Sequence, residues 1–513
     1  MKKLRILSAS LFLSVFLNAG FSQQIDQAYI LPGSVITELN RLNEAYQMLD
    51  QFSAAVWPGW NDYMTYPFLF TFQNGLRVLV GHPSPPSVFV PYPDITVRGL
   101  RINIDTTELN DFTISQPFDA GGGPLTMGSF NNKPVTIVDI RLAAHVSDQP
   151  DTGFHAENNI LTYIHELMHC YQPKFLKVQY GNLRINPDLN MALYSDIEGR
   201  ALLKAYEQDT YDKSLPFIKD FCIAHSLKVR DLSTSEKNSY SADEFREGEA
   251  VYSEVTILGE IGRGFRSSLS TGDDPSYTQF SGIDKYLGRY RENLRNSTGN
   301  TLEIYGKNYW YGCFKALLLQ KYYPGWQKEI EDGRWPDQIF REKTAISPSD
   351  SLADLQRFQV IYGIDSLKSK HEAVITERDE AYRAFKNRKG RVYIIDMKPV
   401  IQTAMTTVAK NRKNYHLGLM YMYPEGLGNM KFNDVSLEFK SVPAEINELY
   451  YIKIVDTHPR KSGRHYRIRY GSAEAGGIYN DVTITTPLFI LKAPKISVIE
   501  TSGRTKFRIL ART

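Results

Sequence analysis

The chain has 513 residues, of which 42% are hydrophobic and 12% aromatic, so it can bury more than one core. We therefore expect a globular protein of two or three domains. The formal net charge is +3, and three positive charges lie in the first five residues, at Lys2, Lys3 and Arg5. The rest of the chain is near neutral, which gives no electrostatic reason to expect nucleic acid or an anionic membrane as a partner.

Residues 1–22 have the pattern of a secretory signal peptide. The basic residues are followed by an apolar run from Ile6 to Leu17 and then by the small residues Ala19 and Gly20. This run is too short to span a bilayer, and no later segment is continuously apolar over the length of a membrane helix. We therefore expect an exported protein, periplasmic or secreted, with no integral membrane segment in the mature chain.

The N-terminal part alternates helical and strand patterns. A helix is predicted over Ser34–Phe52, with Ser34 as its N-cap, and two alternating runs joined at Asn74-Gly75 predict a β-hairpin. A further strand is predicted over Lys133–Leu142. Because it shortly precedes the segment discussed next, an extended peptide could bind there as an additional strand.

The segment Asn159–Gln172 carries apolar residues at helical spacing and is followed by Pro173, so it predicts a helix. His165 and His169 are four residues apart, which places both imidazoles on one helix face, close enough to share one metal ion. Glu166 lies beside them, where it can accept a proton from a water molecule that the metal has acidified. The alternative is two ordinary helix histidines with an exposed glutamate, but only ten histidines occur in the chain, which favours the metal.

A catalytic zinc ion usually takes a third protein ligand. Two downstream segments qualify, because each contains Glu-Gly-x-Ala and places its glutamate, Glu198 or Glu247, on an apolar helical stripe. Glu254 lies on the same stripe as Glu247, whereas Glu249 lies off it. A carboxylate facing a core is unfavourable without a partner, so Glu198, Glu247 and Glu254 each need one.

The combination of His-Glu-Leu-Met-His with the downstream Glu-Gly-Glu-Ala-Val-Tyr-Ser-Glu resembles the gluzincin metallopeptidases, which include thermolysin-like, aminopeptidase-N-like and peptidase MA-like families. The resemblance implies that His165, His169 and Glu247 bind one zinc ion per chain and that Glu166 is the general base. Other segments, such as "VWPGWNDYMTYPFLF", are similar to those of uncharacterised exported bacterial proteins with the same zinc motif.

The spacing departs from the familiar gluzincin pattern. Glu247 lies 78 residues after His169, which is a longer gap than usual, whereas Glu198 lies 29 residues after it but lacks the tyrosine of the motif. Both glutamates therefore remain open as the third ligand. Glu254 is expected to orient a metal-binding histidine through a hydrogen bond, or else to be an exposed helix residue.

In the gluzincins a tyrosine or histidine often donates a hydrogen bond to the developing oxyanion. Tyr309 and Tyr311, in an aromatic helix that begins near Asn308, are candidates for this role. His155, in the loop before the helix of His165, is another candidate. The alternative for the tyrosines is packing, because the chain has 32 of them. The three tryptophans that have Pro-Gly turns nearby are expected to pack in the core, and the three cysteines are expected to be buried and free. These residues are Trp57, Trp60, Trp326, Cys170, Cys222 and Cys313.

The pattern changes near residue 390. An amphipathic helix is predicted to end at Gly390, and short alternating runs after it predict an all-β domain. We expect an α+β fold, in which a zincin-like catalytic region, consisting of a small β-sheet and a helical bundle over residues 24–385, precedes a C-terminal β domain over residues 391–513.

The sequence thus predicts an exported zinc metallopeptidase that hydrolyses peptide or protein substrates. Two other functions stay open. One is a catalytically silent zinc protein, against which the retained Glu166 counts. The other is an exported adhesion or binding protein, which export, the many aromatic residues and the β domain would suit.

Overall fold

The fold is described from a computed structural model. It places residues 31–72, 76–105, 125–130, 133–139, 155–176, 187–269, 274, 276–277, 279–295, 305–346, 350–397, 415–417, 420–423, 427, 429–432, 435–440, 443–447, 451–457, 466–501 and 504–510. The predicted signal peptide lies outside the described residues. Among the described residues, the two largest hydrophobic core clusters lie in the N-terminal part and in the C-terminal β region.

The N-terminal sheet has the strand order β3-β4-β2-β1-β6-β5. Its strands are β1 Phe68–Thr71, β2 Arg77–Val80, β3 Val90–Val97, β4 Leu100–Asp105, β5 Leu125–Phe130 and β6 Lys133–Asp139. β1 pairs parallel with β6, and every other pair in this sheet is antiparallel. The antiparallel pairing of the predicted hairpin is confirmed, because β1 and β2 are antiparallel neighbours, whereas its turn at Asn74-Gly75 lies outside the described residues.

The position of β6 differs from the expectation that an extended peptide could pair with it. β6 lies between β1 and β5 and uses both of its edges for pairing with them. Among the described strands it is β5 that ends the sheet on this side, and β5 also contacts the helix that carries His165 and His169. A strand's neighbours are set by long-range pairing, which the local pattern of 133–142 does not contain.

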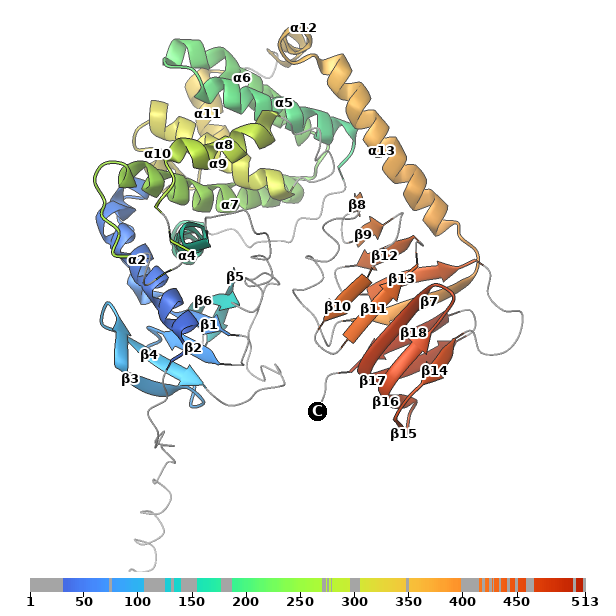
Figure 1. Cartoon of the computed structure of the whole chain (residues 1–513). Coiled ribbons are helices and arrows are strands. Elements are labelled where there is room, and N and C mark those ends of the chain that lie inside the picture. The colour runs from blue at the N-terminus through green and yellow to red at the C-terminus, as the bar shows by residue number, and fades with distance from the viewer. Residues whose placement is uncertain are drawn as a thin grey trace, which may run out of the picture.

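Helices form the rest of the N-terminal part (Figure 1). They are α2 Gly33–Val56, α4 His155–Tyr171, α5 Leu189–Tyr206, α6 Tyr211–Lys228, α7 Thr234–Ile261, α8 Ile283–Arg295, α9 Tyr305–Tyr322, α10 Trp326–Glu331, α11 Pro336–Thr344, α12 Asp350–Tyr362 and α13 Ile364–Lys386. The helix α4 lies between the sheet and α7, and it contacts α2, β5, β6 and α7. This central position buries α4 on several sides.

Two helix ends test the predicted boundaries. The prediction of Ser34 as N-cap is wrong, because α2 begins at Gly33 after Pro32 and no side chain caps it. The carbonyl oxygen of Pro32 accepts the first hydrogen bonds of the helix, from the N–H groups of Val35 and Ile36. At the end of the segment that carries His165 and His169, α4 stops at Tyr171, and Pro173 lies in a short 3-10 turn, Gln172–Lys174.

The expected packing roles of the tryptophans are confirmed. Trp57, Trp60 and Trp326 are buried in the N-terminal core. The ring of Trp57 stacks on Phe175 with a centroid distance of 4.3 Å and meets Trp326 edge-on at 5.5 Å. These contacts join α2, α10 and the chain after α4. The three cysteines are buried and free, also as expected.

The helices α7 and α9 cross with their backbones in contact. A Cβ atom built on Gly248 would lie 2.2 Å from the Cα atom of Gly312, and one built on Gly312 would lie 2.2 Å from the carbonyl oxygen of Glu244. Only glycine fits at this crossing. Gly199, in the other Glu-Gly-x-Ala segment, also packs against α9, where its Cβ would lie 2.9 Å from the Tyr311 ring. Both glycines of the repeated motif therefore allow close packing on α9.

Gly248→Ala is expected to destabilise the protein by about 1–3 kcal/mol, because the added methyl group must separate the two backbones. Gly259→Ala on the same helix is the control. Its Cβ would lie at an ordinary 3.4 Å from Ile283, so the higher helix propensity of alanine should leave stability equal or raise it by up to about 1 kcal/mol. Urea unfolding of both variants measures the difference, and equal midpoints would contradict the described crossing.

The C-terminal part is rich in β-structure. The order of its long path is β10-β11-β17-β18-β7-β13-β12-β9-β8, and β14, β15 and β17 pair with β16. The strands are β7 Arg391–Asp396, β8 Tyr415–Leu417, β9 Met420–Tyr423, β10 Asn429–Phe432, β11 Val435–Phe439, β12 Ala444–Asn447, β13 Tyr451–Asp456, β14 Arg467–Arg469, β15 Ser472–Glu474, β16 Ile478–Thr485, β17 Phe489–Thr501 and β18 Arg504–Ile509. The α+β class with a C-terminal sheet is thus confirmed.

The long helix α13 leads into this sheet (Figure 1). It contacts α5, and near its end Phe385 packs against Val455 of β13. Gly390 follows the helix with φ +154, and a Cβ there would lie 1.8 Å from the carbonyl oxygen of Asp456, so this junction requires glycine. Among the described helices, none has an apolar stretch sufficient to span a membrane.

Candidate metal centre

The helices α4 and α7 bring His165, His169 and Glu247 together. One nitrogen of each histidine and one carboxylate oxygen lie within 4.8 Å of one another, and all three residues are buried. Oε2 of Glu247 is 3.4 Å from Nε2 of His169 and 3.7 Å from Nε2 of His165. A tetrahedral zinc ion with ligands at about 2.0–2.2 Å separates its donor atoms by about 3.4 Å, so this donor set fits zinc in chemistry and in spacing.

The other ring nitrogen of each histidine has its own acceptor. Nδ1 of His165 is 2.6 Å from Oε1 of Glu254, and Nδ1 of His169 is 2.9 Å from Oε1 of Gln172. The amide of Gln172 donates to the backbone carbonyl of Arg246 at 2.7 Å, which orients its oxygen toward His169. Acceptors at both Nδ1 atoms select the tautomer that leaves both Nε2 atoms free to bind a metal.

Glu254 therefore has the predicted position, hydrogen-bonded to the Nδ1 atom of His165. Its second oxygen, Oε2, accepts a hydrogen bond from the Tyr286 hydroxyl. Gln172 and Tyr286 were not anticipated. Gln172 is a polar residue directly after the helix that carries the histidines, which in the sequence gives only a weak indication of its role. Tyr286 lies on α8, and only the tertiary structure shows that it reaches Glu254.

The carboxylates and the histidines of the centre shift each other's pKa values. Burial alone raises the pKa of Glu247, but attraction to His169, hydrogen bonds from both histidines and the Arg246 guanidinium hold it well below its usual range. Burial lowers the pKa of His165, yet hydrogen bonds to Glu247 and Glu254 and the charges of Glu254 and Glu166 raise it to about 10. A metal ion binds the neutral imidazole, so its binding should release the proton that these carboxylates hold.

Glu166 and Tyr309 border the same centre. Glu166 is 8% exposed and makes no hydrogen bond or ion pair within the described part of the chain. The ring of Tyr309 stacks on His165 with a centroid distance of 6.1 Å and an interplanar angle of 16°. Tyr311, in contrast, is fully buried and donates its hydroxyl proton to the carbonyl of Ser195, which is a packing role. His155 begins α4, four residues earlier than the predicted helix, and its side chain lies outside the description.

The structure places Glu198 in a different cluster. Its carboxylate accepts a hydrogen bond from Nζ of Lys228, lies 2.8 Å from Nζ of Lys315 and lies 3.0 Å from Nδ1 of His225. Lys315 also pairs with Glu244 and, at 2.8 Å, with Asp337. We refer to these six residues, Glu198, His225, Lys228, Glu244, Lys315 and Asp337, as the ionic cluster.

The ionic cluster contains enough carboxylates for a metal site, since ligand atoms of Glu198, His225, Glu244 and Asp337 lie within 4.8 Å of one another. However, two lysine ammonium groups, those of Lys228 and Lys315, already lie among its three carboxylates and form ion pairs with them. The charge of Lys228 and then of Lys315 outweighs the effect of burial and holds the pKa of Glu198 well below its usual range. Of the two glutamates considered for zinc, the structure therefore brings only Glu247 to the histidines.

Glu249 was expected to lie off the buried stripe, but it is fully buried. Both of its carboxylate oxygens are sealed from solvent and have no hydrogen-bond partner. Burial raises the pKa of Glu249 well above its usual range. The expectation is wrong because α7 is packed by α4 on one side and by α9 on another.

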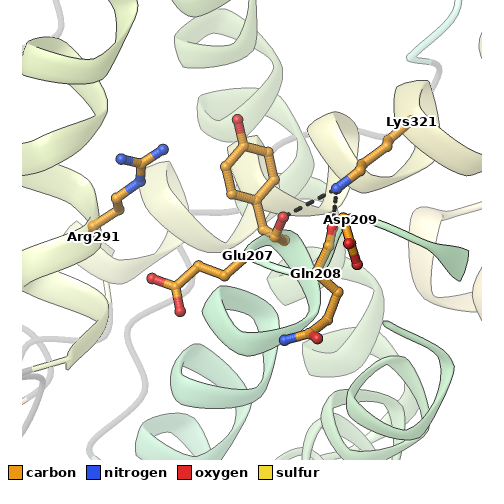
Figure 2. A pocket seen from close by; sticks show the side chains of 6 residues that line it. Glu207, Gln208, Asp209, Arg291 and Lys321 are labelled. Atoms are coloured by element: carbon orange, nitrogen blue, oxygen red, sulfur yellow. Dashed lines mark hydrogen bonds between the residues drawn. The ribbon is translucent and has the colours of Figure 1, made fainter. Parts of the chain in front are cut away.

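A surface pocket lies away from these centres, and Figure 2 shows that its lining comes from the end of α5, from α8 and from α9. Nζ of Lys321 donates to the carbonyl oxygens of Tyr206 and Gln208, which satisfies the C-terminal end of α5. Glu207 pairs with Arg295 at 2.7 Å, and Asp209 pairs with Lys213 at 3.0 Å. Because these charged groups bind one another, the pocket offers no comparable chemistry.

No family model, no curated protein and no solved structure matches the chain. The functional argument therefore depends on the geometry of the centre formed by His165, His169 and Glu247 and on the residues around it.

Proposed function

We propose that the protein is a zinc-dependent peptidase of the gluzincin type. The observation that supports this most directly is the orientation of the two histidines. Both Nε2 atoms face one oxygen of Glu247, while Glu254 and Gln172 hold the Nδ1 atoms from behind. A zinc ion with three protein ligands and one open position is the usual catalytic arrangement.

In this proposal Glu166 is the general base. Its carboxylate lies next to the metal ligands, takes a proton from the attacking water and passes that proton to the leaving amine. Bound zinc would supply a lowered water pKa and polarisation of the scissile carbonyl. Tyr309, which stacks on His165, is proposed to donate a hydrogen bond to the oxyanion that develops.

The substrate would be a peptide or protein outside the cytoplasm, because the first 22 residues have the pattern of a signal peptide. The C-terminal sheet has its own apolar core, and we assign it a packing or substrate-positioning role. No described residue of this sheet belongs to a metal-capable cluster.

Glu247→Gln tests the proposed centre. The neutral amide keeps the shape of the side chain but loses the charge that binds the cation, so about one zinc per chain is expected in the wild type and almost none in the variant. Elemental analysis of purified protein measures the content, and a mixture of quenched fluorescent peptides measures cleavage. Cleavage should disappear with the metal and on chelation.

Two parallel variants make this result specific. Glu198→Gln should retain zinc, because the ionic cluster is separate from the histidines, and Glu260→Gln on α7 controls for the substitution itself. Circular dichroism confirms that each variant is folded. Zinc retained in Glu247→Gln, or cleavage that survives chelation, would contradict the proposed function.

A further inference from the structure

One buried carboxylate near the candidate metal centre, that of Asp243, makes no hydrogen bond or ion pair with the described residues, and the nearest compensating charge is that of Arg246. Asp243 lies on α7 one helical turn before Glu247, and residues four apart share a helix face. It is 7% exposed, and within the described residues it makes no hydrogen bond and no ion pair. A buried ionised carboxylate without compensation is unfavourable by several kcal/mol, so its position needs a physical explanation.

The other acidic residues buried on this helix have such an explanation. Glu244 pairs with Lys315, Glu247 faces the histidines, and Glu254 bonds to His165. Glu249 is sealed from solvent, and burial raises its pKa, so it is not exposed to a ligand. In contrast, Asp243 keeps 7% of its surface exposed, and neither of its oxygens is among the fully buried polar atoms that lack a hydrogen-bond partner.

The surroundings place Asp243 at the His169 side of the centre. The amide of Gln172 bonds to the carbonyl of Arg246, and the ring of Phe175 meets that of Phe245 at 6.3 Å, so the first half of α7 runs beside the end of α4. Burial raises the pKa of Asp243 to about 6, and Arg246 and Glu247 are close enough to shift it in opposite directions. Asp243 thus lies within electrostatic reach of a zinc ligand.

We propose that Asp243 binds a cationic nitrogen of the peptide substrate beside the scissile bond, either an α-ammonium group or the head of a lysine or arginine side chain. This inference rests on the proposed peptidase function. A cation would compensate the buried charge and form charge-assisted hydrogen bonds with both carboxylate oxygens. A second metal ion is disfavoured, because no group of metal-capable side chains in the described residues includes Asp243.

Binding measurements without turnover test the inference. The Glu166→Gln protein, loaded with zinc, is titrated calorimetrically with three probes: tetra-alanine amide with a free amino terminus, its N-acetylated form, and N-acetyl-lysyl-trialanine amide. We expect one cationic probe to bind at least about tenfold more tightly than the neutral probe, as a hydrogen bond to a charged group should provide. Adding Asp243→Asn should remove this preference, whereas adding the exposed Asp284→Asn should not.

The probe that binds more tightly identifies the source of the cation. Preference for the free terminus indicates an exopeptidase, and preference for lysine indicates cleavage next to basic residues. Equal affinity for all probes, binding of none, or a preference that survives Asp243→Asn would overturn the inference. Two zinc ions per chain, falling to one in Asp243→Asn, would also overturn it by making Asp243 a metal ligand.

Cleavage of the fluorescent peptides by the wild-type protein is measured separately. If the wild type cleaves them but no binding preference depends on Asp243, only the inference about Asp243 is wrong. If the preference depends on Asp243 but the wild type cleaves none of the peptides, the peptidase proposal is wrong and Asp243 remains a cation-binding residue.

Discussion

Replacing Glu166 with glutamine is expected to lower kcat for peptide cleavage by at least about 100-fold, the usual contribution of a general base. The amide cannot accept the proton of the attacking water. Zinc content should stay unchanged, because the metal donors are assigned to His165, His169 and Glu247. Steady-state kinetics on a fluorescent peptide and elemental analysis of the same sample measure the two quantities together.

The control for this variant is Glu372→Gln, which makes the same change at an exposed position on α13. It should cleave at the wild-type rate. If Glu166→Gln cleaves as fast as wild type, the assigned role of Glu166 is wrong. If Glu166→Gln loses both cleavage and zinc while circular dichroism shows that it is folded, Glu166 contributes to metal binding rather than to proton transfer.

Replacing Lys315 with methionine is expected to destabilise the protein by about 3–5 kcal/mol, which is typical for removing one partner from a buried ion pair. The Lys315 side chain is 1% exposed, and its Nζ atom lies among Glu198, Glu244 and Asp337. Methionine fills similar volume but leaves the remaining carboxylates undercompensated. Urea unfolding at pH 7.5 measures the change.

The effect of Lys315→Met should depend on pH. In the wild type Glu198 has a depressed pKa, so its pairing contributes stability above the unfolded-state pKa of about 4.3, and this stability is lost as pH falls further. In the variant the carboxylates that have lost their partner should take up protons at higher pH, so the loss of stability should be smaller at pH 5 than at pH 7.5. Lys343→Met, at an exposed position, should change stability by less than about 0.5 kcal/mol. A loss below 1 kcal/mol for Lys315→Met would contradict the described cluster.

The elements that were predicted correctly are mostly those whose structure is set by a local sequence pattern. The hairpin around Asn74-Gly75, the helix ending before Pro173 and the strands after Gly390 follow from turn residues and from the periodicity of apolar residues. The predicted Ser34 cap was wrong, because the helix begins one residue earlier, at Gly33, and Ser34 already lies inside it. The pairing partners of β6 could not be anticipated, since its neighbours come from distant parts of the chain.

The sequence alone could not distinguish the roles of the two Glu-Gly-x-Ala segments. Both glutamates are buried, and each lies on a helix that packs on α9. Both glycines allow this close packing, so the local pattern is the same in the two segments. Their partners differ. Glu198 meets Lys228 from α6 and Lys315 from α9, whereas Glu247 meets the histidines of α4.

The sequence by itself determined that His165 and His169 share one helix face with Glu166 beside them, because a separation of four residues is set by the helix repeat. It also determined that buried glutamates would need partners, because an uncompensated charge in a core is unfavourable. Only the tertiary structure decided that Glu247 joins the histidines, that Gln172 and Tyr286 complete the hydrogen bonds behind them, and that Asp243 stays unpaired within the described chain. These contacts join segments far apart in the sequence, and only the packing of α4 against α7 brings them together.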